Sequence, residues 1–346
     1  MKKLKAGVIG ATGYAGFELV RLLINHTYVE LAAVSSISYT GKKISEVYPQ
    51  LTGICELVLT DEDKVTEDCD IVFASLPAGH SEPIARRCFD KGKIFIDMGA
   101  DFRLKDEGDY EKWYGGSYED KELHKEAVYS IPELHRNNLK GAKLIANPGC
   151  YVTSVCLGLY PALISGEVEP SGIVADSKSG ATGAGRGLSL NTHFTECNEA
   201  FAPYKLACHR HTPEIEQVLG EAVKNKLRLT FIPHLLPANR GIESTIYVNL
   251  KDNYDFKKLR KAYEEAYADE PFVKLLPEGA IANIKNVKYS NYCHISLHED
   301  SRTGKLIIVS VLDNMVKGAA GQAIQNMNIS LGFDEVEGLG AVPPAF

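Results

Sequence analysis

The sequence has no closely spaced cysteine pairs, no apolar run long enough to cross a membrane and no excess of positive charge. Its eight cysteines are scattered singly at positions 55, 69, 88, 150, 156, 197, 208 and 293. This distribution is typical of reduced thiols in a cytosol rather than of a disulfide framework. The formal net charge of −7 gives no reason to expect nucleic acid or an anionic membrane as a partner.

The N-terminal segment also lacks the features of a secretory signal. Basic residues at positions 2, 3 and 5 are followed by a short apolar run, which ends at Gly10. No stretch of the sequence approaches the roughly 20 apolar residues of a membrane span. We therefore expect a cytoplasmic, globular protein.

A chain of 346 residues exceeds what one hydrophobic core usually serves, so two domains are expected. In the first part, apolar segments predict strands at 5–9, 29–35, 71–76, 94–98 and 143–147. Helical periodicity follows the first strand and recurs at 82–89. Strands that alternate with helices predict a Rossmann-like, doubly wound parallel sheet with right-handed crossovers.

The pattern changes after residue 148. Short strands are expected at 173–177, 229–232, 242–250 and 306–312, and the third of these alternates between apolar and polar residues. Such alternation is typical of an antiparallel or mixed sheet with one solvated face. A closing helix is expected over 315–331. We therefore predict an α/β protein in which 1–148 and 315–346 form the nucleotide-binding domain. An inserted α+β domain for catalysis and oligomerisation is expected over 149–314.

Three glycines, Gly10, Gly13 and Gly16, follow the first expected strand and lead into a helix. Their spacing is similar to the dinucleotide fingerprint, with the middle glycine displaced by one residue. Glycines at such a turn let the backbone approach a pyrophosphate, which the helix N-terminus then attracts. A tight strand-to-helix connection without a ligand is the alternative.

The end of the second expected strand favours NADP over NAD. An NAD site usually places a carboxylate there for the ribose hydroxyls. This chain has Ser36 and Ser38, followed by Lys42 and Lys43, and these groups suit a 2′-phosphate. A serine-rich loop with solvated lysines is the alternative.

The most specific local signal is Asn147–Tyr151, in which Pro-Gly forces a turn and Cys150 falls where the next helix begins. A thiol at a helix N-terminus has a lowered pKa and a larger thiolate fraction, which suits a nucleophile. Such a thiolate forms a thioester with an activated acyl group. A structural cysteine is the alternative, and Cys156 is expected to be one because it lies in an apolar helix.

His209 and His211 are the expected proton-transfer partners of this thiolate. Thr212 is expected to cap a helix that has Pro213 in its first turn, so both imidazoles should lie just ahead of the helix. The sequence does not rank the two histidines. The alternatives are a metal site that includes Cys208, and surface histidines in a polar loop.

Candidate anion clamps lie elsewhere in the chain. Arg186 follows a glycine-rich polar segment that is expected to be a flexible loop over 177–186. Arg103 follows the strand at 94–98, where doubly wound sheets place ligand contacts. His234 and Arg240 are weaker candidates.

Several motifs, in the same order, resemble the N-acetyl-γ-glutamyl-phosphate reductases of arginine biosynthesis. They are Gly10–Gly16, Ser75–His80, Asp97–Leu104, Asn147–Tyr151, Ser179–Arg186, His209–Ile215 and Asp313–Asn328. The resemblance spans nearly the whole chain. The wider superfamily includes aspartate-semialdehyde dehydrogenase, which is similar in fold and chemistry.

The resemblance implies an NADPH-dependent reduction of an acyl phosphate to an aldehyde through a Cys150 thioester, with release of inorganic phosphate. His209 and His211 would be catalytic, and no metal is expected. Substrate binding is expected from Arg103, Arg186, Asn147 and Arg210. Cofactor binding is expected from Gly10, Thr12, Gly13, Tyr14, Ala15, Gly16, Ser36, Ser38, Ser75, Pro77, Ser179, Gly180, Gly183 and Asn314. A homodimer or homotetramer is expected.

The chain departs from the family pattern at two positions. Relatives often have Ser-Arg-Ser where this chain has Ser36-Ile37-Ser38, and often have serine where it has Gly99. We still expect NADP to be preferred over NAD, by a smaller margin. Two other functions remain open: a sister reductase acting on aspartyl phosphate, and a non-catalytic, NADP-binding redox sensor.

Overall fold

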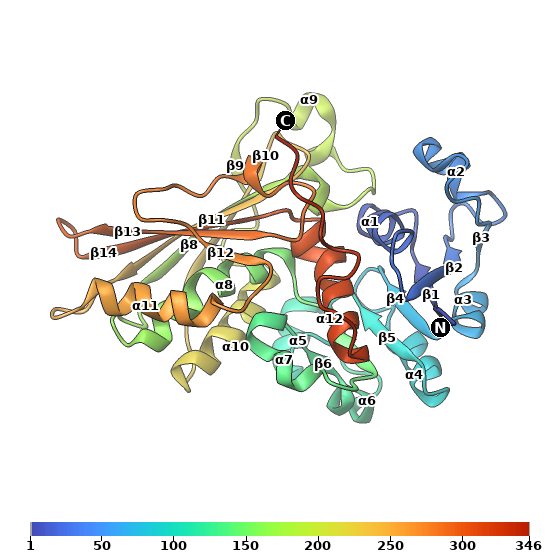
Figure 1. Cartoon of the computed structure of the whole chain (residues 1–346), viewed down its shortest axis with the longest axis horizontal. Coiled ribbons are helices and arrows are strands. Elements are labelled where there is room, and N and C mark those ends of the chain that lie inside the picture. The colour runs from blue at the N-terminus through green and yellow to red at the C-terminus, as the bar shows by residue number, and fades with distance from the viewer. Residues whose placement is uncertain (1, 346) are drawn as a thin grey trace. The chain divides into compact units, whose positions relative to one another are not determined.

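The computed structural model describes residues 2–345, which divide into two compact units (Figure 1). The first unit contains residues 2–148 and Ala319–Gly340, and the second contains Gly149–Gly318 and residues 341–345. Every helix within residues 2–345 is too short or too polar to cross a lipid bilayer.

The first unit is built on a seven-stranded sheet in the order β3-β2-β1-β4-β5-β7-β6, and all of its strand pairs are parallel. The strands are β1 (Leu4–Ile9), β2 (Val29–Ser35), β3 (Leu59–Thr60), β4 (Ile71–Ala74), β5 (Ile94–Asp97), β6 (Val128–Tyr129) and β7 (Leu144–Ala146). Every residue of β4 and β7 is buried, as expected of parallel strands that helices cover on both faces. The predicted parallel sheet is confirmed.

Eight helices belong to the first unit. They are α1 (Tyr14–Leu23), α2 (Ile44–Val47), α3 (Glu62–Asp68), α4 (Glu82–Asp90), α5 (Glu107–Tyr114), α6 (Lys121–Glu126), α7 (Pro132–Leu139) and α12 (Gly321–Leu331). A closing helix was predicted over 315–331, and its predicted start was wrong. The α-helix begins only at Gly321, because Val316–Ala320 form a π-helical turn. From this turn α12 continues and contacts α7 and α1.

The second unit contains a mixed seven-stranded sheet in the order β12-β13-β14-β11-β8-β10-β9. The strands are β8 (Ile173–Gly180), β9 (Ala202–Pro203), β10 (Leu229–Leu236), β11 (Ile242–Asn249), β12 (Val273–Leu275), β13 (Cys293–Asp300) and β14 (Lys305–Leu312). The helices are α8 (Cys150–Ser165), α9 (Phe194–Cys197), α10 (His211–Val223) and α11 (Phe256–Tyr267). The predicted strands at 173–177 and 229–232 were too short, because residues 178–180 and 233–236 also pair with neighbouring strands.

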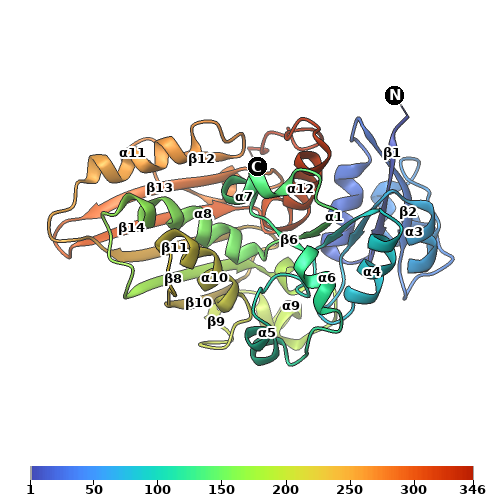
Figure 2. The same ribbon diagram turned by 90° about the horizontal axis from the view of Figure 1, so that it is seen from below.

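One face of the second sheet carries the helices. In both Figure 1 and Figure 2, α8, α10 and α11 lie on the same side of it. Along β11, buried Ile242, Ile246 and Val248 alternate with partly exposed residues. Gly158 lets α8 approach closely, since an added Cβ would lie 3.0 Å from the Ile246 side chain. The predicted mixed sheet is confirmed, and its helices lie on one face.

Two buried carboxyls hold the connection that follows β4. Asp97, at the end of β5, accepts hydrogen bonds at Oδ1 from the Ser81 hydroxyl (2.7 Å) and the Gly99 N–H (2.9 Å). Asp101 accepts from the N–H groups of Gly79 (2.6 Å) and Ser81 (2.7 Å). Burial, and then the nearby Asp101, raise the pKa of Asp97 to about 6.

The raised pKa of Asp97 predicts a pH-dependent effect of Asp97→Asn on stability. An acid whose pKa is higher in the folded than in the unfolded protein destabilises the fold as pH rises from its unfolded value through about 6. Asparagine never ionises. The variant should therefore gain about 1 kcal/mol or more of unfolding free energy relative to wild type between pH 5 and pH 8. Urea unfolding at both pH values measures this difference.

Comparing two pH values removes any constant packing cost of the amide. The exposed Asp252→Asn serves as the control and should show no such change. A free-energy difference between Asp97→Asn and wild type that is the same at both pH values contradicts the prediction.

Candidate active site

The glycine turn after β1 requires glycine at two of its three positions. Gly10 has φ +77°, and an added Cβ there would lie 2.4 Å from the Ser75 carbonyl oxygen. A Cβ on Gly16 would lie 2.2 Å from the Gly10 carbonyl oxygen. Gly13 is the N-cap of α1 and supplies no capping side chain. The turn is thus packed against the end of β4, and it fits the pyrophosphate of a dinucleotide because the N-terminus of α1 has no anionic cap.

Other expected cofactor residues lie around this turn, at the carboxyl ends of the parallel strands. The Thr12 and Ser36 hydroxyls are 2.7 Å apart, and the Tyr48 hydroxyl donates to the Thr12 carbonyl oxygen (2.9 Å). The Ser75 N–H donates to the Ile9 carbonyl oxygen (3.0 Å). Tyr14 and Ala15 begin α1, Pro77 follows β4, and Ser38 is exposed after β2. Ligands of open parallel sheets bind at this edge.

Arg103 and Asn147 are neighbours in the first unit. The Arg103 guanidinium donates from Nε to the Asn147 carbonyl oxygen and from Nη2 to that of Met98, both at 2.9 Å. The Asn147 side chain donates to the Ala319 carbonyl oxygen (3.1 Å) and accepts from Asn326 (3.0 Å). Both side chains are therefore fixed by the protein itself.

Cys150 is the first residue of α8, as the sequence predicts. Its N-cap, Gly149, has extended backbone angles and no capping side chain. The Gly149 N–H donates to Oε1 of Glu214 (2.9 Å), and Glu214 is fully buried. On another side, Gly318 packs so closely that its added Cβ would lie 2.8 Å from the Cys150 Cβ. Cys150 is a partly exposed residue, and its thiol is thus attached to the start of a helix, where the dipole favours a thiolate.

The buried cysteines differ from Cys150. Burial raises the pKa of the Cys156 thiol and raises those of Cys69 and Cys88 to about 11. Cys156 is fully buried, which confirms that it is a core residue. Such thiols remain protonated and unreactive at neutral pH.

The two histidines take different positions at the start of α10. The prediction that Thr212 caps the helix was wrong: Arg210 is the N-cap, and His211 is already helical. The helix starts earlier because the Thr212 N–H donates to the His209 carbonyl oxygen (3.0 Å), which closes a turn before Thr212. Only His209 therefore precedes the helix.

His211 lies against the turn that carries Cys150. A Cβ added to Gly149 would lie 2.4 Å from Nε2 of His211, so the imidazole fills the space beside this residue. The Tyr151 ring contacts both imidazoles, with centroids 5.7 Å from His209 and 5.9 Å from His211. The structure therefore brings together the predicted Cys150 and His211.

His209 lies deeper and is only 9% exposed. Its ring packs against Tyr151, Tyr204 and Phe231. Burial, with smaller effects from nearby cations, lowers the pKa of His209 to about 4. It is neutral at pH 7, and its Nδ1 accepts the backbone N–H of His211 (3.1 Å).

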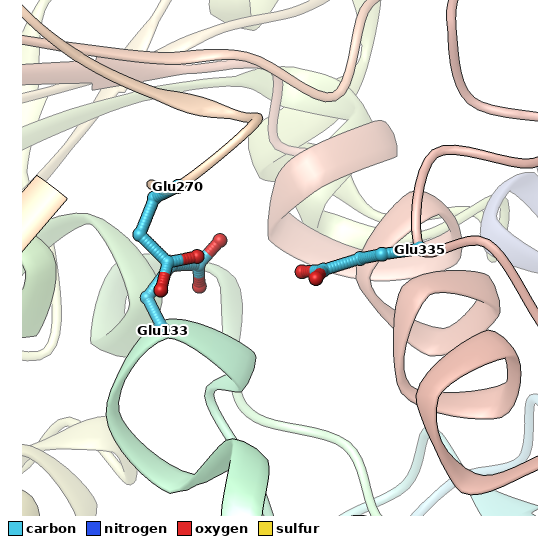
Figure 3. A group of neighbouring side chains, drawn as sticks. All are labelled: Glu133, Glu270 and Glu335. Carbon is cyan, nitrogen blue, oxygen red and sulfur yellow. The ribbon is translucent and has the colours of Figure 1, made fainter. Parts of the chain in front are cut away.

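The alternative metal site at Cys208, His209 and His211 is not formed. The potential ligand atoms of these three residues do not gather within the described part of the chain. Figure 3 draws a different set of side chains, the carboxylates of Glu133, Glu270 and Glu335. Glu133 and Glu335 both accept hydrogen bonds from Gln325 Nε2, at 3.1 and 2.7 Å. Glu270 belongs to the other unit, so the three carboxylates do not form a site within one unit.

The segment expected to be a flexible loop over 177–186 begins as strand. Ser179 and Gly180 end β8, so the prediction was wrong for this half of the segment. Gly180 is glycine because an added Cβ would lie 2.7 Å from backbone atoms of Asn239. Asn314 accepts from the Gly241 N–H (2.8 Å) and donates to the Thr182 hydroxyl (3.0 Å).

Ser179, Gly183 and Asn314 lie together in the second unit. A Cβ on Gly183 would be 3.1 Å from the Ser179 hydroxyl and 3.5 Å from the Asn314 amide nitrogen. Arg186 is partly exposed and Arg210 is exposed.

The two weaker anion candidates lie beside acids. Arg240 lies 3.4 Å from Asp313 and over the Tyr289 ring. His234 Nδ1 is 3.2 Å from an oxygen of Asp176. These contacts give both side chains a role inside the protein.

Sequence reasoning missed Glu214 and the acids Asp97 and Asp101. Glu214 follows His211 by three residues, which places both on one side of the first turn of α10. That spacing is the only signal for Glu214 in the sequence. The two aspartates lie within the motif Asp97–Leu104, in which only Arg103 was predicted to be functional.

Comparison with known proteins identifies the family. The family description "Semialdehyde dehydrogenase, NAD binding domain" matches residues 5–142, and "Semialdehyde dehydrogenase, dimerisation domain" matches residues 150–314. A protein from Brachyspira hyodysenteriae named N-acetyl-gamma-glutamyl-phosphate reductase is 59% identical over 351 residues, which cover 99% of this chain and 100% of that protein.

Solved structures support the fold. Aspartate semialdehyde dehydrogenase II of Vibrio cholerae, complexed with ASA, has a TM-score of 0.72 at 15% identity and covers 96% of this chain and 99% of its own. Aspartate semialdehyde dehydrogenase with NADP from Candida albicans has a TM-score of 0.67 at 16% identity, covering 95% and 98%. At such low identity these likenesses show the fold alone. The identity with the Brachyspira protein shows more: the chain belongs to the N-acetyl-γ-glutamyl-phosphate reductase family of the semialdehyde dehydrogenases.

Proposed function

We propose that this chain reduces N-acetyl-γ-glutamyl phosphate to N-acetylglutamate semialdehyde and inorganic phosphate, with NADPH, in arginine biosynthesis. The observation that carries the proposal is Cys150 at the uncapped start of α8, with the His211 imidazole beside Gly149. The 59% identity with a reductase of this name supports the substrate.

The first half of the reaction requires an anionic sulfur. In the proposal, His211 accepts the thiol proton and the N-terminus of α8 stabilises the thiolate. The sulfur attacks the acyl carbon, a C–S bond forms, and the C–O bond to phosphate breaks. Free N–H groups at the start of α8 stabilise the oxyanion that forms during this attack.

The second half converts the thioester to an aldehyde. A reduced nicotinamide, when bound, supplies the hydride to the thioester carbon. The C–S bond then breaks, the carbonyl re-forms and Cys150 leaves as the thiolate, which recovers its proton from His211. Covalent capture divides one difficult reduction into two easier steps.

We assign different roles to the two histidines. Because His211 fills the space beside Gly149, it is the proton carrier. His209 has its pKa lowered to about 4 by burial, so it is neutral and accepts the His211 N–H. We therefore regard His209 as a positioning residue.

We propose cofactor and substrate contacts for residues of both units. Gly10, Gly13 and Gly16 suit the pyrophosphate, and NADP is proposed because β2 is not followed by a carboxylate. The NADP in the Candida albicans structure supports this proposal. Arg103, Arg186, Asn147 and Arg210 are proposed to contact the substrate anion.

Aspartyl phosphate is the alternative substrate, because the structural neighbours are aspartate semialdehyde dehydrogenases. The phosphate-dependent reverse reaction, measured with N-acetylglutamate semialdehyde and with aspartate semialdehyde, distinguishes the two. A non-catalytic redox sensor is less well supported, since sensing does not require an imidazole beside the thiolate.

Assembly is proposed to involve the open face of the second sheet. Partly exposed Val174, Tyr247 and Ile307 form a row across β8, β11 and β14 on the face opposite α8. The matching family description is a dimerisation domain. We therefore propose a homodimer or homotetramer in the cytoplasm, where eight free cysteines are compatible with reducing conditions.

Replacement of the proposed nucleophile tests the reaction. Cys150→Ser should lower kcat by roughly three orders of magnitude or more, because the hydroxyl is not ionised by the helix and imidazole. Steady-state assay with N-acetylglutamate semialdehyde, phosphate and NADP measures this loss, and circular dichroism checks the fold. The control, Cys197→Ser, should keep wild-type activity. Turnover by Cys150→Ser near the wild-type rate contradicts a thioester.

Gly149→Ala tests the contact between His211 and the cysteine turn. The backbone angles of Gly149 suit alanine, but its methyl would meet the imidazole at 2.4 Å. Displacement of His211 should lower kcat by about 100-fold and alter its pH profile, with little effect on NADP affinity. Gly340→Ala, where the added Cβ meets nothing within 4 Å, is the control. Normal kcat in Gly149→Ala removes His211 from the proposed mechanism.

Sedimentation velocity tests the proposed assembly. Wild type should sediment as a dimer or tetramer, and Ile307→Asp should yield a smaller species, because a charge cannot be buried in an apolar interface at low cost. Ile164→Asp, at an exposed position near the end of α8, should leave the size unchanged. A monomeric wild type, or an unaffected Ile307→Asp assembly, contradicts this interface.

A further inference from the structure

Residues 36–43, which link β2 to α2, form a loop that is hydrogen-bonded to the neighbouring strand β3 and the residues next to it. The Ser36 N–H donates to the Thr60 carbonyl oxygen (3.2 Å), and the Gly41 N–H donates to that of Leu59 (2.8 Å). The Leu59 N–H in turn donates to the Lys42 carbonyl oxygen (2.8 Å). These bonds hold the loop at the carboxyl end of β2, where a Rossmann-type sheet receives the adenosine ribose.

The same loop is joined to the glycine turn. The Ser36 hydroxyl lies 2.7 Å from the Thr12 hydroxyl, and the Thr40 hydroxyl donates to the Ser36 carbonyl oxygen (2.7 Å). The Ser36 hydroxyl is therefore already engaged with the turn. Ile37, the next residue, is 95% exposed and brings no charge. A positive charge that recognises the 2′-phosphate of NADP must therefore come from another residue of the loop.

Two lysines end the loop, and their surroundings differ. Lys43 Nζ is 3.3 Å from a Glu56 carboxylate oxygen, so its charge is largely compensated. Lys42 Nζ instead lies 5.9 Å from the centroid of the Tyr39 ring, and no carboxylate of residues 2–345 forms an ion pair with it. An aromatic face orients an ammonium group without neutralising it. Lys42 thus holds an uncompensated positive charge over the loop.

We propose that Lys42, oriented by Tyr39, binds the 2′-phosphate of the dinucleotide and makes this chain select NADP over NAD. A phosphate monoester carries nearly two negative charges at pH 7, which favours a charge-assisted hydrogen bond with an ammonium. The exposed Ser38 hydroxyl lies in the same loop and is a second donor. This inference rests on the proposed dinucleotide site and assigns its selectivity to one residue.

Binding of cofactor fragments tests the assignment without catalysis. Isothermal titration calorimetry on the full chain compares 2′,5′-ADP with 5′-AMP, which differ only in the 2′-phosphate. Wild type should bind 2′,5′-ADP at least about tenfold more tightly. Lys42→Gln should lose most of this preference and keep its affinity for 5′-AMP. Lys43→Gln, whose lysine is paired with Glu56, should keep the preference.

Each other outcome overturns a definite part of the proposal. If Lys42→Gln keeps the preference, or if Lys43→Gln loses it equally, Lys42 is not the selecting residue, although NADP binding stands. If Lys42→Gln weakens both fragments equally, the Tyr39–Lys42 pair contacts adenine instead of the 2′-phosphate. A wild type that binds neither fragment contradicts the dinucleotide site itself. The ratio of kcat/KM for NADPH and NADH should change in parallel with the fragment preference.

Discussion

The rest of the site depends on the close approach of the His211 ring to Gly149. Any side chain at position 149 would occupy the space of the imidazole, with a Cβ 2.4 Å from Nε2. Glycine therefore forms the N-cap of α8 and cannot offer the capping oxygen that serine, threonine or aspartate would provide. The N–H groups at the start of α8 are left for an anion, and Cys150 is the residue that lies there.

Each unit has a helix that begins with a glycine N-cap and lacks a capping side chain, and the two helix starts suit different anions. Gly13 before α1 and Gly149 before α8 both follow a parallel strand, both have extended backbone angles, and neither caps its helix with a side chain. By contrast, four other helices are capped by aspartate: α3, α5, α6 and α11. A carboxylate cap stabilises a helix but repels phosphate or thiolate. The uncapped starts of α1 and α8 are therefore favourable to negative charge; α4, α7 and α10 also lack a side-chain cap, but none of these three begins with a glycine N-cap after a parallel strand.

The sequence predicts those features that local chemistry determines. Buried parallel strands are continuous apolar runs, and the glycine turn and the Pro-Gly-Cys turn are set by a few adjacent residues. Features set by contacts between distant residues were missed. The helical start at His211 depends on a turn closed by His209, and the strand at Ser179–Gly180 depends on pairing with β10 and β11. The buried Glu214 is recognised only once Gly149 is beside it.

The acids after β5 show why polar groups remain in such a core. Burial of Asp97 is unfavourable, as its raised pKa indicates, and Asp101 is buried beside it. Yet the N–H groups of Gly79 and Ser81 lie in an irregular connection and have no strand to pair with, so Asp101 accepts both. An apolar residue at position 101 would remove the acceptor of both N–H groups, and the donor of Ser81, which is buried, would be left unsatisfied at a cost. The connection after β4, where the cofactor residues Ser75 and Pro77 are expected, is held in place at the expense of stability.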